Sequence, residues 1–198
     1  MVEVAVSDLS LQLLDRAAVD AIVLFVADEE RPLRGLAGLC DWRMCGALSR
    51  TLASGWYQGR VGEALLTPTG RRLAAARVFA FGVGPAAGGA AAMAELLPHT
   101  FGALQRARIE SCALPPPWPG LELGASLDLW SRCAADGPHR QLLLGDSKAL
   151  QKGLEEAGAR LPWRPWSPAW LPSSGGASLR EHAADDTLAR AKRERSRP

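Results

Sequence analysis

The chain lacks any apolar run long enough to cross a bilayer, and no basic segment followed by an apolar one opens it. Its longest continuous apolar stretch, residues 21–26, has only the length of a strand. These absences predict a protein with no membrane partner and no signal peptide, and we expect it in the cytoplasm. The formal net charge is only +2, which argues against a protein built mainly to coat nucleic acid.

Motifs that carry chemistry are also missing. The four cysteines form no C-x-x-C pair, which indicates reduced thiols, and the histidines His99, His139 and His182 are scattered. No G-x-S-x-G sequence is present, and the glycines of residues 82–89 do not have G-x-G-x-x-G spacing. We therefore expect no metal, no cofactor and no catalytic residue, and thus a protein that is not an enzyme.

What the sequence does contain is an alternation of short strands and amphipathic helices. Strands are predicted at 2–6, 21–26, 63–67, 77–81, 109–114 and 141–144. Helices are predicted over 36–54, after the glycine loop at 82–89 with a kink or break at Pro98, over 121–133, and from a cap at Asp146 or Ser147 to 157. The unbroken apolar run at 21–26 favours a central strand covered on both faces. The pattern predicts an α/β domain with a parallel or mixed sheet flanked by helices.

Four segments together resemble a known family. They are Asp20-Ala-Ile-Val-Leu-Phe-Val26, Gly35-Leu-Ala-Gly-Leu39, Gly59-Arg-Val-Gly-Glu-Ala-Leu-Leu66 and Arg77-Val-Phe-Ala-Phe-Gly-Val-Gly84. Residues 19–160 are similar to the N-terminal domain of the two-metal leucine aminopeptidases, which implies a macro-like α/β fold. In that family the metal ligands and the Asn-Thr-Asp-Ala-Glu-Gly-Arg signature lie in a second domain. The resemblance therefore implies a free-standing domain without aminopeptidase chemistry.

Two glycine-containing loops are the candidate ligand site. Such loops can present backbone N–H groups to a phosphate near strand ends. The candidate residues are Gly35, Gly38, Gly82, Gly84, Gly88 and Gly89. A macro-type domain that binds a nucleotide or an ADP-ribose-like molecule is accordingly the alternative function. The sequence departs from the ADP-ribose-binding pattern, because Asp28 and not asparagine follows the first long strand.

The C-terminal part has a different composition. We divide the chain into a domain at 1–160 and an irregular tail at 161–198, extended or disordered, rich first in tryptophan and proline and then in charge. Tryptophans are costly to leave in water, so the predicted partner-binding residues are Trp130, Trp163, Trp166 and Trp170. The main functional prediction is a non-catalytic interaction or regulatory module that binds a protein partner or self-associates. Nucleic acid is a possible partner but not the favoured one.

Overall fold

The structure, a computed structural model, describes residues 2–85, 89–116, 118, 121–156 and 161–170. Its first compact unit, residues 1–166, is built on one mixed seven-stranded sheet of strand order β3-β4-β2-β5-β6-β1-β7. In chain order the elements are β1 Glu3–Asp8, α1 Leu11–Leu14, β2 Ala21–Ala27, α2 Gly35–Arg43, α3 Ala47–Ala53, β3 Ala64–Pro68, β4 Arg77–Gly84, α4 Gly89–Arg106, β5 Ser111–Leu114, α5 Leu123–Cys133, η2 Ala134–Asp136, β6 Arg140–Gly145, α6 Ser147–Glu156 and β7 Trp163–Pro165. All neighbouring strands are parallel except the β3–β4 pair. This confirms the predicted mixed α/β fold.

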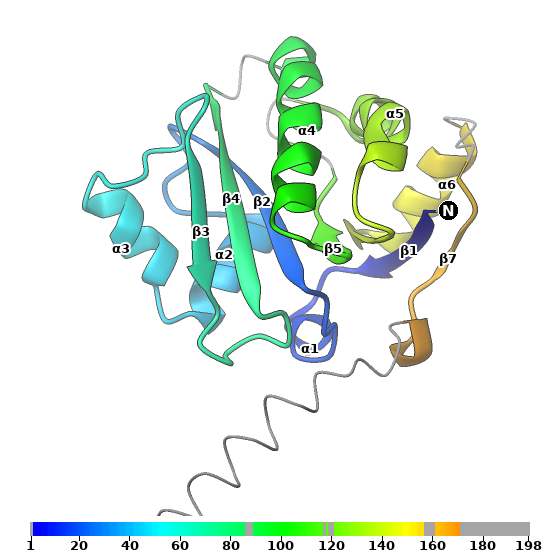
Figure 1. Cartoon of the computed structure of the whole chain (residues 1–198), viewed down its shortest axis with the longest axis horizontal. Coiled ribbons are helices and arrows are strands. Elements are labelled where there is room, and N and C mark those ends of the chain that lie inside the picture. The colour runs from blue at the N-terminus through cyan, green and yellow to red at the C-terminus, as the bar shows by residue number, and fades with distance from the viewer. Residues whose placement is uncertain (1, 86–88, 117, 119–120, 157–160, 171–198) are drawn as a thin grey trace, which may run out of the picture. The chain divides into compact units, whose positions relative to one another are not determined.

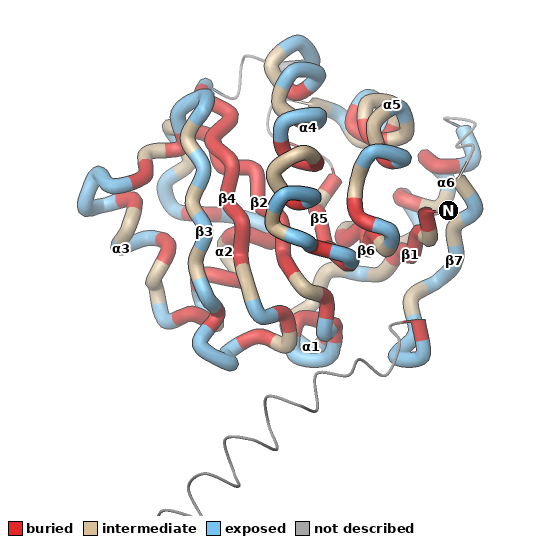
Figure 2. The backbone as a smooth tube through the Cα atoms, in the orientation of Figure 1, coloured by how far each residue is buried: buried red, intermediate tan, exposed pale blue. Residues whose placement is uncertain are grey.

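Helices cover both faces of the sheet. Figure 1 shows α4 and α5 in front of the sheet and α2 behind it. Every residue of β2 is buried, as the continuous apolar run predicted, and Figure 2 shows the central strands as the most buried part of the backbone. On the α4 side, Val23 and Phe25 of β2 belong to one apolar cluster with Leu97, Phe101 and other residues of the covering helices. The core thus lies between this sheet face and α4, α5 and α6.

The helix predicted over 36–54 is two helices. Its apolar stripe is correct, since Leu36, Cys40, Met44, Leu48 and Leu52 are all buried. The helix nevertheless ends at Arg43 and begins again at Ala47, with Cys45 and Gly46 at φ 55° and 75° between them.

The side chain of Asp41 explains why the second helix starts where it does. Its Oδ1 accepts hydrogen bonds from the backbone N–H groups of Leu48 and Ser49, at 2.8 and 3.1 Å. The Ser49 hydroxyl donates to the other carboxylate oxygen. A carboxylate that satisfies the free N–H groups of a helix start stabilises that start, so the chain turns between two helices.

Two further expectations need correction. Helix α4 is not broken at Pro98, the second of the two outcomes predicted there, and Leu97 and Phe101 on either side of the proline are buried in the core. The sequence assigns residues 161–166 to an irregular tail, whereas Trp163–Pro165 form β7 and pair with β1. Proline weakens the prediction of a strand, but it is tolerated on an edge strand, and β7 is at the edge of the sheet.

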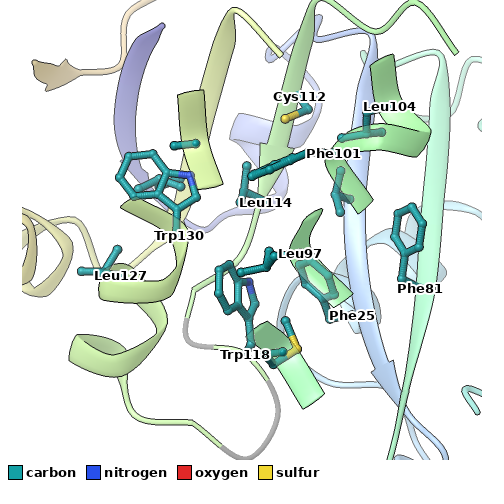
Figure 3. Close-up of a cluster of buried hydrophobic side chains, with 14 of the residues drawn as sticks. Phe25, Phe81, Leu97, Phe101, Leu104, Cys112, Leu114, Trp118, Leu127 and Trp130 are labelled. Atoms are coloured by element: carbon teal, nitrogen blue, oxygen red, sulfur yellow. The ribbon is translucent and has the colours of Figure 1, made fainter. Parts of the chain in front are cut away.

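One buried polar cluster fixes the junction of α5, η2 and β6. Gln141 is fully buried, and its Oε1 accepts a hydrogen bond of 2.7 Å from Nε1 of Trp130. Its amide nitrogen donates to the carbonyl oxygens of Ala134 and Pro138, at 2.7 and 3.1 Å. Figure 3 shows Trp130 among the apolar side chains of this core. A single side chain therefore satisfies three groups that have no access to water.

Replacing Gln141 with leucine tests this account. The buried indole N–H and two carbonyl groups would lose their partners, so we expect the free energy of unfolding to fall by about 2–4 kcal/mol. Denaturant unfolding followed by circular dichroism measures the change. Gln12→Leu, at an exposed position of α1, is the matched control and should change stability little. Equal unfolding midpoints for the two variants would contradict the assigned role of Gln141.

Candidate functional site

A cavity of about 490 Å³ lies where β2 and β5 end. Its walls come from the last residues of β2, the loop that joins β2 to α2, the first turn of α2 and the segment after β5. β2 and β5 are parallel neighbours, so their carboxyl ends meet at one edge of the sheet. In open α/β sheets this edge is the usual place for a ligand, because the loops there diverge to cover opposite faces.

The first turn of α2 opens into this cavity. Gly35, Leu36 and Ala37 line the cavity, and no side chain caps the helix, whose N-cap residue is Arg34. The N–H groups of a first helical turn have no partner within the helix, and together with the helix dipole they attract anions. Arg34 itself is exposed and lines the cavity, which adds a positive charge beside the helix start.

Arginine and glutamate side chains hold the β2–α2 loop in place. Nη1 of Arg31 donates to the carbonyl oxygen of Glu30 at 2.8 Å, and Nη2 donates to that of Gln58 at 3.2 Å. Oε1 of Glu30 accepts from the backbone N–H of Arg34 at 2.9 Å. The loop is therefore attached to the segment around Gln58, while Arg31 makes no ion pair among the residues described.

Glu63 fixes the segment to which Arg31 is attached. Its Oε2 accepts hydrogen bonds from the backbone N–H groups of Gln58 and Arg60, at 2.8 and 3.1 Å. These bonds, that of Gln58 foremost, hold the pKa of Glu63 below its ordinary value of 4.5. While it is ionised, Glu63 thus holds Gln58, whose carbonyl oxygen accepts the hydrogen bond of Arg31 in the cavity wall.

Acidic residues form the first part of the same loop. Asp28 follows β2 directly, and a hydrogen bond with the Glu29 side chain, then burial, raises the pKa of Asp28. Glu29 and Glu30 line the cavity. The cavity therefore has a basic part, formed by the α2 start with Arg31 and Arg34, and an acidic part next to it. Such a division suits a ligand with both anionic groups and hydrogen-bond donors.

Two aromatic side chains form the apolar part of the wall. Phe25 and Trp118 meet edge to face, with ring centroids 5.4 Å apart, as Figure 3 shows. Trp118 is only 2% exposed, and its indole Nε1 has no hydrogen-bond partner among the described residues. Buried donors are nearly always paired, so an unpaired one in the wall of a cavity is a candidate contact for a ligand acceptor.

The structure separates the six glycines predicted to bind a ligand. Gly35 lines the cavity, and Gly38 packs against the backbone of Leu33. Gly82 and Gly84 lie against the 58–61 segment, where a β-carbon on Gly82 would stand 2.1 Å from the carbonyl oxygen of Arg60. Gly89 is the first residue of α4, and Gly88 is outside the described residues. Close backbone contact accounts for Gly82, whereas Gly84 has φ 69° and lies against the side chain of Val61.

The tryptophans predicted to bind a partner do not form one exposed surface. Trp130 is in the core, so the prediction that it contacts a partner is wrong for the folded chain. Trp163 lies in β7 and packs partly against the core, and the backbone N–H of Trp166 donates to Val6 at 2.9 Å. Trp170 is in η3, Pro168–Trp170, which belongs to the second unit, residues 167–198. The apolar character of this segment thus reflects, for Trp163 and Trp166, the pairing of their segment with β1 of the sheet.

Sequence reasoning missed Arg31, Arg34, Phe25 and Trp118. A usable signal existed, because polar loops that directly follow buried parallel strands meet at one edge of the sheet. Applied to the segments that follow residues 27 and 114, this rule predicts that the loop after β2 and the segment after β5 line one site. Within the described residues, no group of three or more His, Cys, Asp and Glu side chains could hold a metal ion. No helix in the described ranges is long and apolar enough to cross a membrane.

Comparisons with known proteins agree with the fold. No protein family description and no curated protein matches the sequence. Among solved structures, the macrodomain of Mycobacterium tuberculosis DarG has a TM-score of 0.57 at 16% identity, covering 74% of this chain and 100% of that one. The Oceanobacillus iheyensis macrodomain with ADP gives 0.54 at 10% identity, covering 77% and 89%.

A mutant of tomato leucine aminopeptidase is similar over 80% of this chain, with a TM-score of 0.55 at 13% identity. The match covers 36% of the tomato chain, so this protein spans about a third of that enzyme. At such identities the likeness shows the fold alone. The chain has a macro-like α/β fold.

The ionisation of Glu63 gives a testable pH dependence. Because folding lowers its pKa, Glu63 stabilises the protein above its unfolded value of about 4.5, and this contribution is lost as the pH falls through the folded value. Glu63→Gln should therefore lower the melting temperature at pH 7 and reduce the loss of stability below pH about 4.5. Differential scanning calorimetry across this range measures both effects. Parallel pH curves for the wild type and Glu63→Gln would contradict the role assigned to Glu63.

Proposed function

We propose that the cavity at the ends of β2 and β5 binds a nucleotide-like ligand, with ADP-ribose as the leading chemical type. The observation that carries the proposal is the opening of the uncapped α2 start and two arginines into one cavity of about 490 Å³. A cavity of this size is in the range used for small ligands and cofactors. The ADP present in the Oceanobacillus macrodomain supports the choice of ligand class.

The parts of the cavity match the parts of such a molecule. A diphosphate fits the N–H groups of Gly35, Leu36 and Ala37, beside the charge of Arg34. An adenine or ribose ring fits the apolar wall with Phe25 and Trp118. Carboxylates at the loop can accept hydrogen bonds from ribose hydroxyl groups.

Titration calorimetry with ADP-ribose tests the proposal, and Gly35 offers a matched pair of variants. The backbone of Gly35 has φ 50°, and a β-carbon there would meet nothing within 4 Å. Gly35→Ala and Gly35→Trp share the cost of that backbone conformation, but only the indole would occupy cavity volume. We expect the tryptophan variant to bind at least roughly tenfold more weakly than the alanine variant.

Two outcomes would overturn the proposal. One is a flat titration of the wild-type protein with ADP-ribose at about 1 mM, the concentration that matches a binding free energy of about 4 kcal/mol. The other is equal affinity for both Gly35 variants with both folds intact by circular dichroism, since the ligand would then lie elsewhere.

We further propose that the domain is related to the aminopeptidase N-terminal domain and does not hydrolyse peptides by itself. The four sequence segments and the fold likeness to the tomato enzyme support the relation. In that family the metal ligands belong to a second domain, so this domain has no counterpart of them. Binding of a protein partner remains a prediction.

Purified protein should therefore leave a leucine chromogenic substrate uncleaved in the presence of Mn²⁺ or Zn²⁺, because two-metal hydrolysis needs ligands of fixed number and geometry. Release of the chromophore, followed by absorbance against a buffer blank, is the measurement. Metal-dependent hydrolysis that stays with the protein through successive columns would contradict this second proposal while leaving the ligand proposal intact.

A further inference from the structure

The small net charge of the whole chain conceals a strong separation of charge. Residues 31–77 contain eight arginines, no lysine and only two carboxylates, whereas residues 1–30 contain seven carboxylates and one arginine. Both carboxylates of the arginine-rich stretch are bound to backbone N–H groups, Asp41 at the start of α3 and Glu63 at Gln58 and Arg60. The positive charges of this stretch are therefore largely unopposed within it.

The same stretch also carries the exposed apolar side chains. Among the described residues, the large hydrophobic side chains that remain exposed are those of Trp42, Trp56, Val61 and Leu66. All four fall between residues 42 and 66. Trp42, at the end of α2, is 63% exposed. An indole left in water costs free energy, and its coincidence with unopposed arginines marks a surface for a partner.

Trp42 and two arginines line one groove of about 750 Å³, and a third arginine, Arg50, is hydrogen-bonded to Cys45 of its wall. Trp42, Arg43 and Arg72 line the groove, together with Cys45 and Ser49. Arg72 donates to the sulfur of Cys45 at 2.7 Å, and Arg50 donates to the Cys45 carbonyl oxygen at 2.6 Å. These bonds hold the two guanidinium groups near each other with no carboxylate on either, since no ion pair among described residues includes them.

The negative groups that face this groove are accounted for. Arg43 is paired with Asp15, and Asp41 is used by α3. The guanidinium carbon of Arg43 lies 5.0 Å from the centre of the Trp42 ring, so Arg43 makes a cation–π contact with one face of the indole. Given the exposure of Trp42, the rest of the ring is open to stacking. The groove therefore offers a planar aromatic surface together with the positive charge of Arg72.

We infer that this groove binds single-stranded nucleic acid, with a base stacked on Trp42 and phosphates on Arg50 and Arg72. An unpaired strand provides both exposed base faces and a regular row of negative charge, the two features for which the groove is complementary. A duplex buries its base faces, so it fits less well. The inference is independent of the proposed ligand in the cavity, because the lining of the cavity shares no residue with that of the groove.

Fluorescence anisotropy with a labelled oligothymidine of about 15 nucleotides tests the inference on the full chain. We expect binding that weakens steeply with salt. Trp42→Ala should weaken it roughly tenfold, and Arg72→Ala should weaken it and reduce the slope against log salt by about one. Trp56→Ala is the matched aromatic control, because Trp56 is 89% exposed but does not line the groove. Arg132→Ala, on α5, is the arginine control.

Four results would overturn the inference. They are no anisotropy change at about 50 mM salt, equal losses in Trp42→Ala and Trp56→Ala, equal affinity for a duplex of the same length, and displacement of the strand by polyglutamate at the same charge concentration. The last would point to a general anion or acidic-protein surface. Calorimetry of Trp42→Ala with ADP-ribose separates the two sites, since that variant should retain the affinity of the wild type for a ligand in the cavity.

Discussion

The contact between the end of β4 and the segment 58–61 is the constraint on which the cavity depends. A β-carbon on Gly82 would stand 2.1 Å from the carbonyl oxygen of Arg60, and one on Gly59 would stand 3.0 Å from the carbonyls of Val26 and Ala27. Backbones can approach this closely only at glycine. The contact brings Gln58 within reach of Arg31, and Arg31 in turn fixes the loop that begins α2. The residues that line the cavity are thus placed by backbone packing on β2 and on its neighbour β4.

The fold could be predicted from the sequence where burial alone decides. The continuous apolar run of β2 requires a strand buried on both faces, and the spaced apolar residues of α5 require a helix with one buried face. The break between α2 and α3 could not be predicted from the sequence. Both helices bury residues of one apolar stripe, and a turn that leaves the spacing of this stripe unchanged does not alter the periodicity. What interrupts the helix is one carboxylate, Asp41, satisfying N–H groups seven and eight residues ahead. Such a cap depends on tertiary geometry and has no fixed sequence spacing.

The candidate site was harder to predict for a related reason. A glycine-rich loop predicts a ligand site, but Gly82 of β4 is explained by the backbone packed against it and Gly84 by its positive φ. Of the candidate glycines Gly35, Gly38, Gly82 and Gly84, Gly35 is the one that combines a left-handed conformation with open space in front of it, as Gly62 and Gly70 also do outside the candidate set. Likewise the tryptophans most prominent in the sequence, among prolines after residue 161, include two that the sheet partly covers, while Trp42 was hidden in a helical pattern and remains exposed. Residue type alone did not distinguish packing from binding in either case.

Helix α2 connects the two surfaces of this protein. Its first turn opens into the cavity at the strand ends, and its last turn presents Trp42 to the arginine groove. The loop that precedes α2 contributes residues to both surfaces. Arg31 and Arg34 line the cavity, and Pro32 and Leu33 line the groove. The two surfaces therefore depend on the placement of one nine-residue helix, α2, which lies beside β2, a strand that is buried along its whole length.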